Sequence, residues 1–208
     1  MMRRLLNVLA VWLLLVAPAR AATPLDYTRT ILEEVHAVVA GNQTQDEKLA
    51  ALAGLLGKFL DTDAMGREAL GQHWSSFTPP QQKEFLALFR KLFQQTYVQT
   101  LLLFQNPDFV YAGEQLSGSG AIVDTKIVTP RDQFDVSYRL IPAGDKWLAI
   151  AITVENVNLT TNLSNQFNRL LGRMTVDDLL ALMRRKYGDR GGEAQGLTTL
   201  RPGVWPVS

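Results

Sequence analysis

The sequence has 208 residues, with 21 Lys and Arg, 20 Asp and Glu, two His and no Cys. That length allows one domain or two small ones. Without cysteine the chain has no disulfide, no thiolate zinc site, no iron–sulfur cluster and no cysteine nucleophile. A net charge of +1 gives no indication of a nucleic-acid partner, and an apolar content of 47% is typical of a globular chain with a core.

The N-terminus has the features of a secretory signal peptide. A basic start (Arg3, Arg4) precedes an apolar run over residues 5–17, and a small-x-small cleavage pattern ends at Ala21. The run is shorter than the roughly 20 apolar residues that span a bilayer, and the alternative is an uncleaved anchor. We expect residues 1–21 to be removed and the mature protein to be exported, with 18 basic and 20 acidic residues and a net charge of −2.

Helical periodicity is present through the N-terminal half. Thr23 precedes a proline and begins a helix that extends to Gly41, and a second helix begins near Thr44. Asp61 or the threonine after it begins a short third helix that Gly71 ends. Apolar residues recur along each of these segments at the spacing of one helix face.

The clearest helix start is Thr78-Pro79-Pro80, which predicts a helix running to about Phe104. Its large apolar side chains spread over about 180° of the helical wheel, whereas a surface helix needs a stripe of only about 100°. Two interpretations are open. The helix packs on two sides in a filled core, or it packs with one flank and lines a cavity with the other.

After Pro107 the hydrophobic period changes from helical to alternating. Residues 109–116, 121–129, 134–141 and 147–155 read as strands separated by short turns. Short turns between consecutive strands favour antiparallel hairpins. The segment therefore predicts a four-stranded, or slightly larger, antiparallel meander with one buried face.

Two closing helices follow the strands, one at about residues 162–171 and one that begins at Thr175. The predicted fold class is α+β, with an N-terminal helical half packed on the meander, closing C-terminal helices, and either an apolar cavity or a filled core between them. Residues 22–190 are predicted to form a single domain. Residues 191–208, rich in Gly and Pro, are predicted to be a flexible tail.

Candidate catalytic residues are few. The two histidines match no metal-binding or nucleophile-activating spacing. The pairs Asp61/Asp63 and Asp177/Asp178 have the chemistry to bind Ca²⁺ or to act as acid and base, but both stand at predicted helix starts, where acidic groups cap free N–H groups. We therefore predict a protein that is not an enzyme, with no catalytic residue, no metal and no cofactor.

The remaining signal is a surplus of large apolar side chains on the long helix and on one face of the sheet. If helices and sheet stand apart, these side chains enclose an apolar cavity that accepts apolar ligands. Most protein interiors are close-packed, so a filled core is the alternative from the residues alone.

The chain resembles the MlaC family, the toluene-tolerance periplasmic proteins that serve ABC-type lipid transport. The resemblance lies in single residues spread along the long helical stretch and in two later segments. They are Phe59, Asp61, Ala64, Leu70-Gly71, Trp74, Thr78, Gln82, Phe85, Phe89, Leu92, Tyr97, Leu101, Val154–Leu159 and Asn165-Gln166-Phe167. The chain departs from the family pattern at Asn156, where the family has a small residue or Gly, and at Asn158 and Thr160-Thr161, which alter the loop before the next helix.

The resemblance implies a helix-backed, cone-like α+β domain that works in the periplasm. It implies a monomer that carries phospholipid between an outer-membrane lipoprotein complex and an inner-membrane ABC transporter complex. The acyl chains would lie inside, without covalent chemistry, and the headgroup would lie in solvent. Trp74 and Phe167 are predicted at the cavity mouth. The predicted lipid contacts are Phe89, Phe93, Tyr97, Leu101, Phe104, Val136, Tyr138, Leu140, Ile150 and Ile152.

Three alternatives remain open. The ligand could be a hopanoid or another polycyclic lipid, because some branches of the family are associated with hopanoid biosynthesis. The protein could be an adaptor that binds a membrane complex and has a filled interior. An enzyme on the same scaffold would need an acid–base group in the pocket, and Asp135 and Arg139 are expected to face outward by strand alternation.

Overall fold

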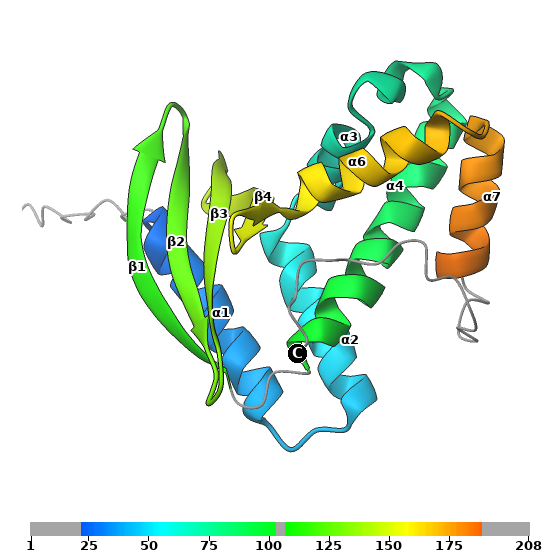
Figure 1. Ribbon diagram of the computed structural model, residues 1–208. Helices are drawn as coiled ribbons and strands as arrows, with labels where there is room; N and C mark the ends of the chain where they lie inside the picture. The colour runs from blue at the N-terminus through cyan, green and yellow to red at the C-terminus, as the bar shows by residue number, and fades with distance from the viewer. Residues whose placement is uncertain (1–21, 103–106, 189–208) are drawn as a thin grey trace, which may run out of the picture.

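A computed structural model describes residues 22–102 and 107–188 (Figure 1). The predicted signal peptide (1–21), Phe104 and the predicted tail (191–208) lie outside the described residues. Within the described part of the chain, no helix combines the length and the apolar character needed to cross a membrane.

The elements follow the predicted order of helices, strands and helices. The first group is α1 (Pro24–Ala40), α2 (Gln45–Phe59), α3 (Thr62–Leu70), the 3₁₀ turn η1 (Gly71–Ser76), α4 (Pro79–Phe93), the π-helical turn η2 (Gln94–Val98) and α5 (Gln99–Leu101). The strands are β1 (Asp108–Ser117), β2 (Gly120–Val128), β3 (Gln133–Ala143), β4 (Lys146–Val154) and β5 (Val157–Asn158). The chain closes with α6 (Leu159–Leu171) and α7 (Val176–Tyr187).

Acidic residues at the predicted helix starts act as caps. An Asp61 carboxylate oxygen accepts a hydrogen bond from the Ala64 amide at 2.8 Å and begins α3. At α7, Thr175 and Asp178 form a reciprocal capping box. The side-chain and backbone hydrogen bonds from Thr175 lower the pKa of Asp178. The capping interpretation of both carboxylate pairs is therefore confirmed for one member of each.

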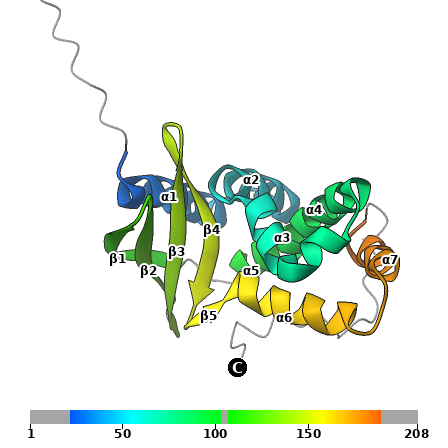
Figure 2. The ribbon, with the colours of Figure 1, turned by 90° about the horizontal axis from the view of Figure 1, so that it is seen from above.

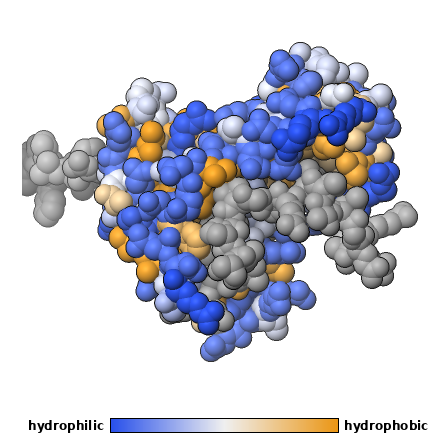
Figure 3. All heavy atoms as spheres, in the orientation of Figure 1, coloured by the Kyte–Doolittle hydropathy of each residue, from blue (hydrophilic) through white to orange (hydrophobic). Residues whose placement is uncertain are grey.

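The five strands form one antiparallel sheet in sequence order, and helices cover one of its faces. Helix α1 lies across that face, and α3, α4, α6 and α7 gather beside the β4 edge of the sheet, where α3 and α6 contact β4 (Figures 1 and 2). The fold class is thus α+β, as predicted, with the short β5 added to the four-stranded meander. The face shown in Figure 3 is mostly hydrophilic, because the large apolar side chains lie mainly inside.

The β4–β5 turn and the start of α6 account for two departures from the family pattern, at Asn156 and Asn158. Glu155 and Asn156 have φ of 48° and 66°, the left-handed conformation that a two-residue type I′ hairpin requires at both central positions. Gly adopts this conformation freely, and Asn is among the residues that tolerate it best. Asn158 caps α6, since its side-chain oxygen accepts a hydrogen bond from the Thr161 amide at 2.9 Å.

This turn yields a stability prediction. Asn156→Ala is expected to lower the free energy of unfolding by about 1 kcal/mol, because alanine is strained in the left-handed region. Asn156→Gly is expected to leave it unchanged or to raise it. Urea denaturation of the wild type and both variants measures the difference. Equal stability of the Ala and Gly variants would contradict the proposed role of the positive φ.

The interior has two parts, which meet along α4. Phe85, Phe89 and Phe167 form a closely packed aromatic group with ring centroids 5.2–6.3 Å apart, and their exposed fractions are 0–1%. This filled part lies among α3, α4, α6 and α7. The other part lies between the C-terminal end of the long helical segment and the sheet, and it contains the cavity described next.

Candidate functional site

An apolar cavity of about 70 Å³ lies between the sheet and the helices. Its wall is drawn from α1, the end of α2, the α4–η2–α5 segment, four strands and the first residue of α6. The lining residues are Ile31, Leu32, Val35, Leu56, Phe59, Leu60, Phe93, Tyr97, Leu101, Phe109, Ile127, Val136, Tyr138, Ile152, Val154 and Leu159.

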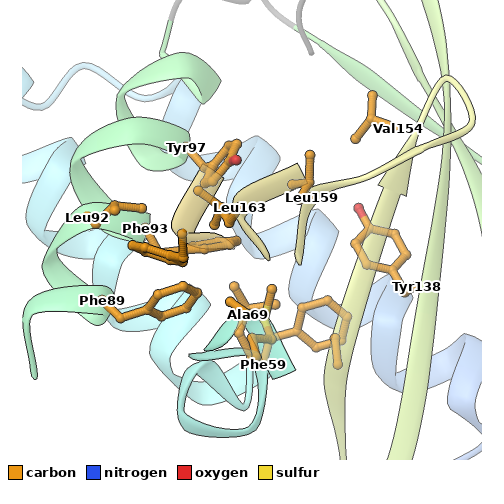
Figure 4. Packing of buried hydrophobic residues seen from close by; sticks show 14 of the residues in the cluster. Phe59, Ala69, Phe89, Leu92, Phe93, Tyr97, Tyr138, Val154, Leu159 and Leu163 are labelled. Carbon is orange, nitrogen blue, oxygen red and sulfur yellow. The ribbon is translucent and has the colours of Figure 1, made fainter. Parts of the chain in front are cut away.

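The sheet wall follows from strand register. Val136 pairs with Val154 and Tyr138 pairs with Ile152 in the antiparallel ladder of β3 and β4, and paired residues point to the same face. Figure 4 shows Tyr138 and Val154 approaching from the sheet, while Tyr97 and Leu159 approach from the helices. The cavity is therefore the space that these two layers leave between them.

The helical wall depends on the spacing of Phe93, Tyr97 and Leu101, four residues apart along α4, η2 and α5. The Phe93 and Tyr97 ring centroids are 4.5 Å apart, and Phe89 lies one turn earlier at 6.3 Å from Phe93 (Figure 4). The long helix thus supplies both parts of the interior. Its N-terminal portion around Phe85 packs in the filled core, and its C-terminal portion around Tyr97 lines the cavity. The two roles are therefore separated along the helix axis rather than between its two flanks.

The structure brings six of the predicted contact residues to the cavity wall. They are Phe93, Tyr97, Leu101, Val136, Tyr138 and Ile152. Of the others within the described residues, Phe89 and Leu140 are fully buried in the hydrophobic core but do not line the cavity. Ile150 is only half-buried and does not line the cavity.

The position of Ile150 has a local cause. The β3–β4 register jumps from Arg139 opposite Ala151 to Leu140 opposite Ala149, so Ile150 is the additional residue of a β-bulge. A bulge reverses the alternation of faces beyond it. Ala149 therefore takes the inward position, where simple alternation placed Ile150.

The two predicted mouth residues lie away from the cavity. Phe167 is 1% exposed and is packed between Phe85 and Phe89, a position incompatible with a cavity mouth. Trp74 lies in the 3₁₀ turn η1 and is also absent from the lining. Among the described lining residues, the partly exposed side chains that form the rim are Leu56, Leu101, Phe109 and Ile152.

Sequence reasoning missed the contribution of α1. Ile31, Leu32 and Val35 line the cavity from the helix that crosses the sheet. The signal in the sequence is the apolar stripe of that helix, which any core-facing helix also shows. The periodicity of this helix therefore predicts which face is buried, but it does not tell whether that face lines a cavity or packs in an ordinary core.

Polar groups are scarce in this wall. Tyr97 and Tyr138 bring the only polar side-chain atoms among the described lining residues. Burial raises the pKa of Tyr138, an effect that a hydrogen bond with the Thr125 side chain partly offsets. Burial also raises the pKa of Tyr97, and the neighbouring Tyr187 adds to the increase. Both hydroxyls are therefore neutral at physiological pH.

The charged residues nearest in sequence to the sheet wall lie on its other face. Asp135 and Arg139 alternate with the buried residues of β3 and are exposed. Asp135 pairs with Lys126 at 2.6 Å, and Arg139 pairs with Glu68 at 3.0 Å. The described cavity wall contains no charged side chain, so burial of hydrocarbon is the interaction that the wall supports.

These features define a helix-backed α+β domain with an internal apolar cavity. The chain belongs to the MlaC family, because the family model described as "MlaC protein" matches residues 27–185. A solved structure with a similar fold is the phospholipid-binding protein from Ralstonia solanacearum in complex with a phospholipid. Its TM-score is 0.67 at 20% sequence identity, and the match covers 80% of this chain and 97% of that chain.

Proposed function

We propose that this protein is a periplasmic shuttle that binds phospholipid without covalent chemistry and holds the acyl chains in the apolar cavity. The observation that carries the proposal is the hydrocarbon wall between sheet and helices, in a chain of the MlaC family. The Ralstonia protein, which shares the fold, was solved with a phospholipid bound. The carrier would exchange its cargo with an outer-membrane lipoprotein complex and an inner-membrane ABC transporter complex.

Energetics favour chain binding by this kind of wall. Each methylene removed from water contributes about 0.8 kcal/mol, so ten buried methylenes contribute roughly 8 kcal/mol before opposing terms. The cavity of about 70 Å³ is smaller than the roughly 300–1,000 Å³ of pockets that enclose drug-sized ligands. Acyl chains would therefore bind only if the helices and the sheet move apart. Burial of the chains would then offset the packing free energy that is lost when these two layers separate.

The direct test is to purify the exported protein from its native host, extract it with organic solvent and identify the extract by mass spectrometry. We expect diacyl phospholipid at about one molecule per protein, because the apolar cavity described above would hold the chains of one lipid. A polycyclic hydrocarbon lipid in its place would change the ligand class. An extract without lipid, from protein that retains its helical circular dichroism signal, would support the adaptor function instead.

The transport step needs a separate measurement. Lipid-loaded protein mixed with empty acceptor vesicles is expected to release its phospholipid to them, and lipid-free protein is expected to extract phospholipid from donor vesicles. Transfer that occurs only when the two vesicle populations collide, and is unchanged by the protein, would overturn the shuttle role while leaving binding intact.

A further inference from the structure

The Tyr97 hydroxyl is an unsatisfied polar atom in the cavity region. Tyr97 is only 6% exposed, and its hydroxyl has no hydrogen-bond partner among the described residues. The other described lining residues have plain hydrocarbon side chains, apart from Tyr138, whose hydroxyl already bonds with Thr125. Within the described ranges, buried polar atoms on Thr160 and Gln166 also have no hydrogen-bond partner, but neither residue lines the cavity.

A buried hydroxyl without a partner is unfavourable for the fold, typically by about 1–3 kcal/mol. Phenylalanine would fill the same space without that penalty, as it does at Phe89 and Phe93 on the two preceding turns. Tyr97 also lies in the π-helical turn η2, a widened turn of a kind that is frequent at functional sites. Each of these observations points to a role for the hydroxyl outside the packing of the protein itself.

The position of Tyr97 indicates which part of a lipid it meets. It stands between the deep wall at Phe93 and the partly exposed rim at Leu101, one helical turn from each. In Figure 4 its hydroxyl is at the end of the ring that points away from α4. A chain inserted from the rim would have its first polar atoms near this level, where chain and glycerol backbone join.

The chemistry of that junction matches a hydrogen-bond donor. A tyrosine hydroxyl is protonated at physiological pH, and burial raises the pKa of Tyr97 further, so the hydroxyl can donate to an acceptor oxygen. In a diacyl lipid the nearest strong acceptor to the hydrocarbon is the ester carbonyl oxygen. A dialkyl ether lipid has the same headgroup and chains without that carbonyl.

We propose that the Tyr97 hydroxyl donates a hydrogen bond to an ester carbonyl of the bound diacyl lipid, so that the site selects ester-linked over ether-linked chains. This inference rests on the proposed lipid-binding function. The Tyr97 hydroxyl is thus a specificity-determining group in an otherwise hydrocarbon wall.

The test is a competition inside one membrane. Lipid-free protein is incubated with vesicles made of equal amounts of dioleoyl phosphatidylglycerol and its dioleyl ether analogue, separated from the vesicles, extracted and analysed by mass spectrometry. The wild type is expected to hold the diester in about two- to tenfold excess, the range that one net hydrogen bond provides. Tyr97→Phe is expected to bring the ratio to about one, the value without that bond.

Tyr187→Phe is the matched control, because it removes a hydroxyl from a buried tyrosine near Tyr97 that does not line the cavity. It is expected to keep the wild-type ratio. Lipid-free Tyr97→Phe is expected to melt at the wild-type temperature or above, since it loses an unsatisfied group.

Two outcomes would overturn the inference: a wild-type ratio near one, or an excess of diester that Tyr97→Phe retains. Failure of the proposed function has a different signature, in which neither lipid is found on either protein. Recovery of lipid by both proteins therefore establishes binding, and the diester-to-diether ratio then decides the role of Tyr97.

Discussion

Ile152→Arg is expected to abolish lipid retention, while Ile150→Arg leaves it at the wild-type level. Ile152 lines the cavity opposite Tyr138, whereas Ile150, two residues earlier on β4, does not line it. Ile152 is partly exposed, but its side chain is part of the hydrocarbon wall, so a cation there loses hydration without gaining a partner among the described lining residues, which costs several kcal/mol. Since each 1.4 kcal/mol is tenfold in affinity, the expected loss of affinity for Ile152→Arg is more than about 100-fold.

The pair makes a controlled experiment because both changes put the same charge on the same strand. Phospholipid per protein, measured by mass spectrometry after organic extraction, is the readout, and circular dichroism shows whether each variant is folded. Folded Ile152→Arg protein with wild-type lipid content would disprove the cavity assignment. Equal loss of lipid from both folded variants would mean that β4 as a whole, rather than its cavity-facing side, governs binding.

The contrast between these two isoleucines also shows how far sequence reasoning reaches in this protein. Alternation along residues 147–155 identified the strand, and it placed Ile152 and Val154 on the buried side. The same alternation carried back to Ile150 failed, because a β-bulge inserts one residue into the ladder at that point. A bulge depends on the pairing of two strands, and the pattern of one strand does not reveal it.

The long helix gives a second example. Its wide apolar arc left open whether the helix packs on two sides or also lines a cavity, and in the structure Phe93, Tyr97 and Leu101 line the cavity. Spacing along a helix fixes which side chains share a face, but it carries no information about what each part of that face meets. Phe89 and Phe93 are consecutive on one face, yet only Phe93 lines the cavity.

Local chemistry was more predictable than tertiary neighbours. The caps at Thr23, Thr44 and Asp61 each bond to the backbone amide three residues later. Both partners therefore lie within one short segment, where the local pattern predicts the contact. The burial of Phe167 depends on Phe85 and Phe89, which lie about 80 residues earlier in the chain. An apolar residue on an amphipathic helix is equally consistent with a cavity mouth and with a filled core until those neighbours are known.

Phe167→Ala is expected to produce the largest loss of stability and no loss of lipid from the folded protein. Phe167 is 1% exposed, and its ring packs edge-on against Phe85 at 5.2 Å between centroids. Truncating a buried Phe to Ala costs about 3–5 kcal/mol, a large share of the roughly 5–15 kcal/mol that stabilises a domain. The expected fall in melting temperature is about 6–20 °C, at about 2–4 °C per kcal/mol for a chain of this size.

Leu101→Ala is the complementary variant, since Leu101 is partly exposed at the cavity rim and lies outside the large core cluster of buried residues. It is expected to weaken lipid binding with a smaller loss of stability, because a half-exposed side chain buries less area. Urea unfolding of lipid-free protein and lipid content at 4 °C, where both variants are expected to be folded, measure the two effects separately. If Phe167→Ala loses lipid but keeps near wild-type stability, the assignment of Phe167 to the filled core is wrong and its predicted place at the cavity mouth is supported. The expected pattern is a loss of stability in Phe167→Ala and a loss of lipid in Leu101→Ala. It would support a division of roles in which the aromatic core stabilises the fold, while the cavity between α4 and the sheet binds the ligand.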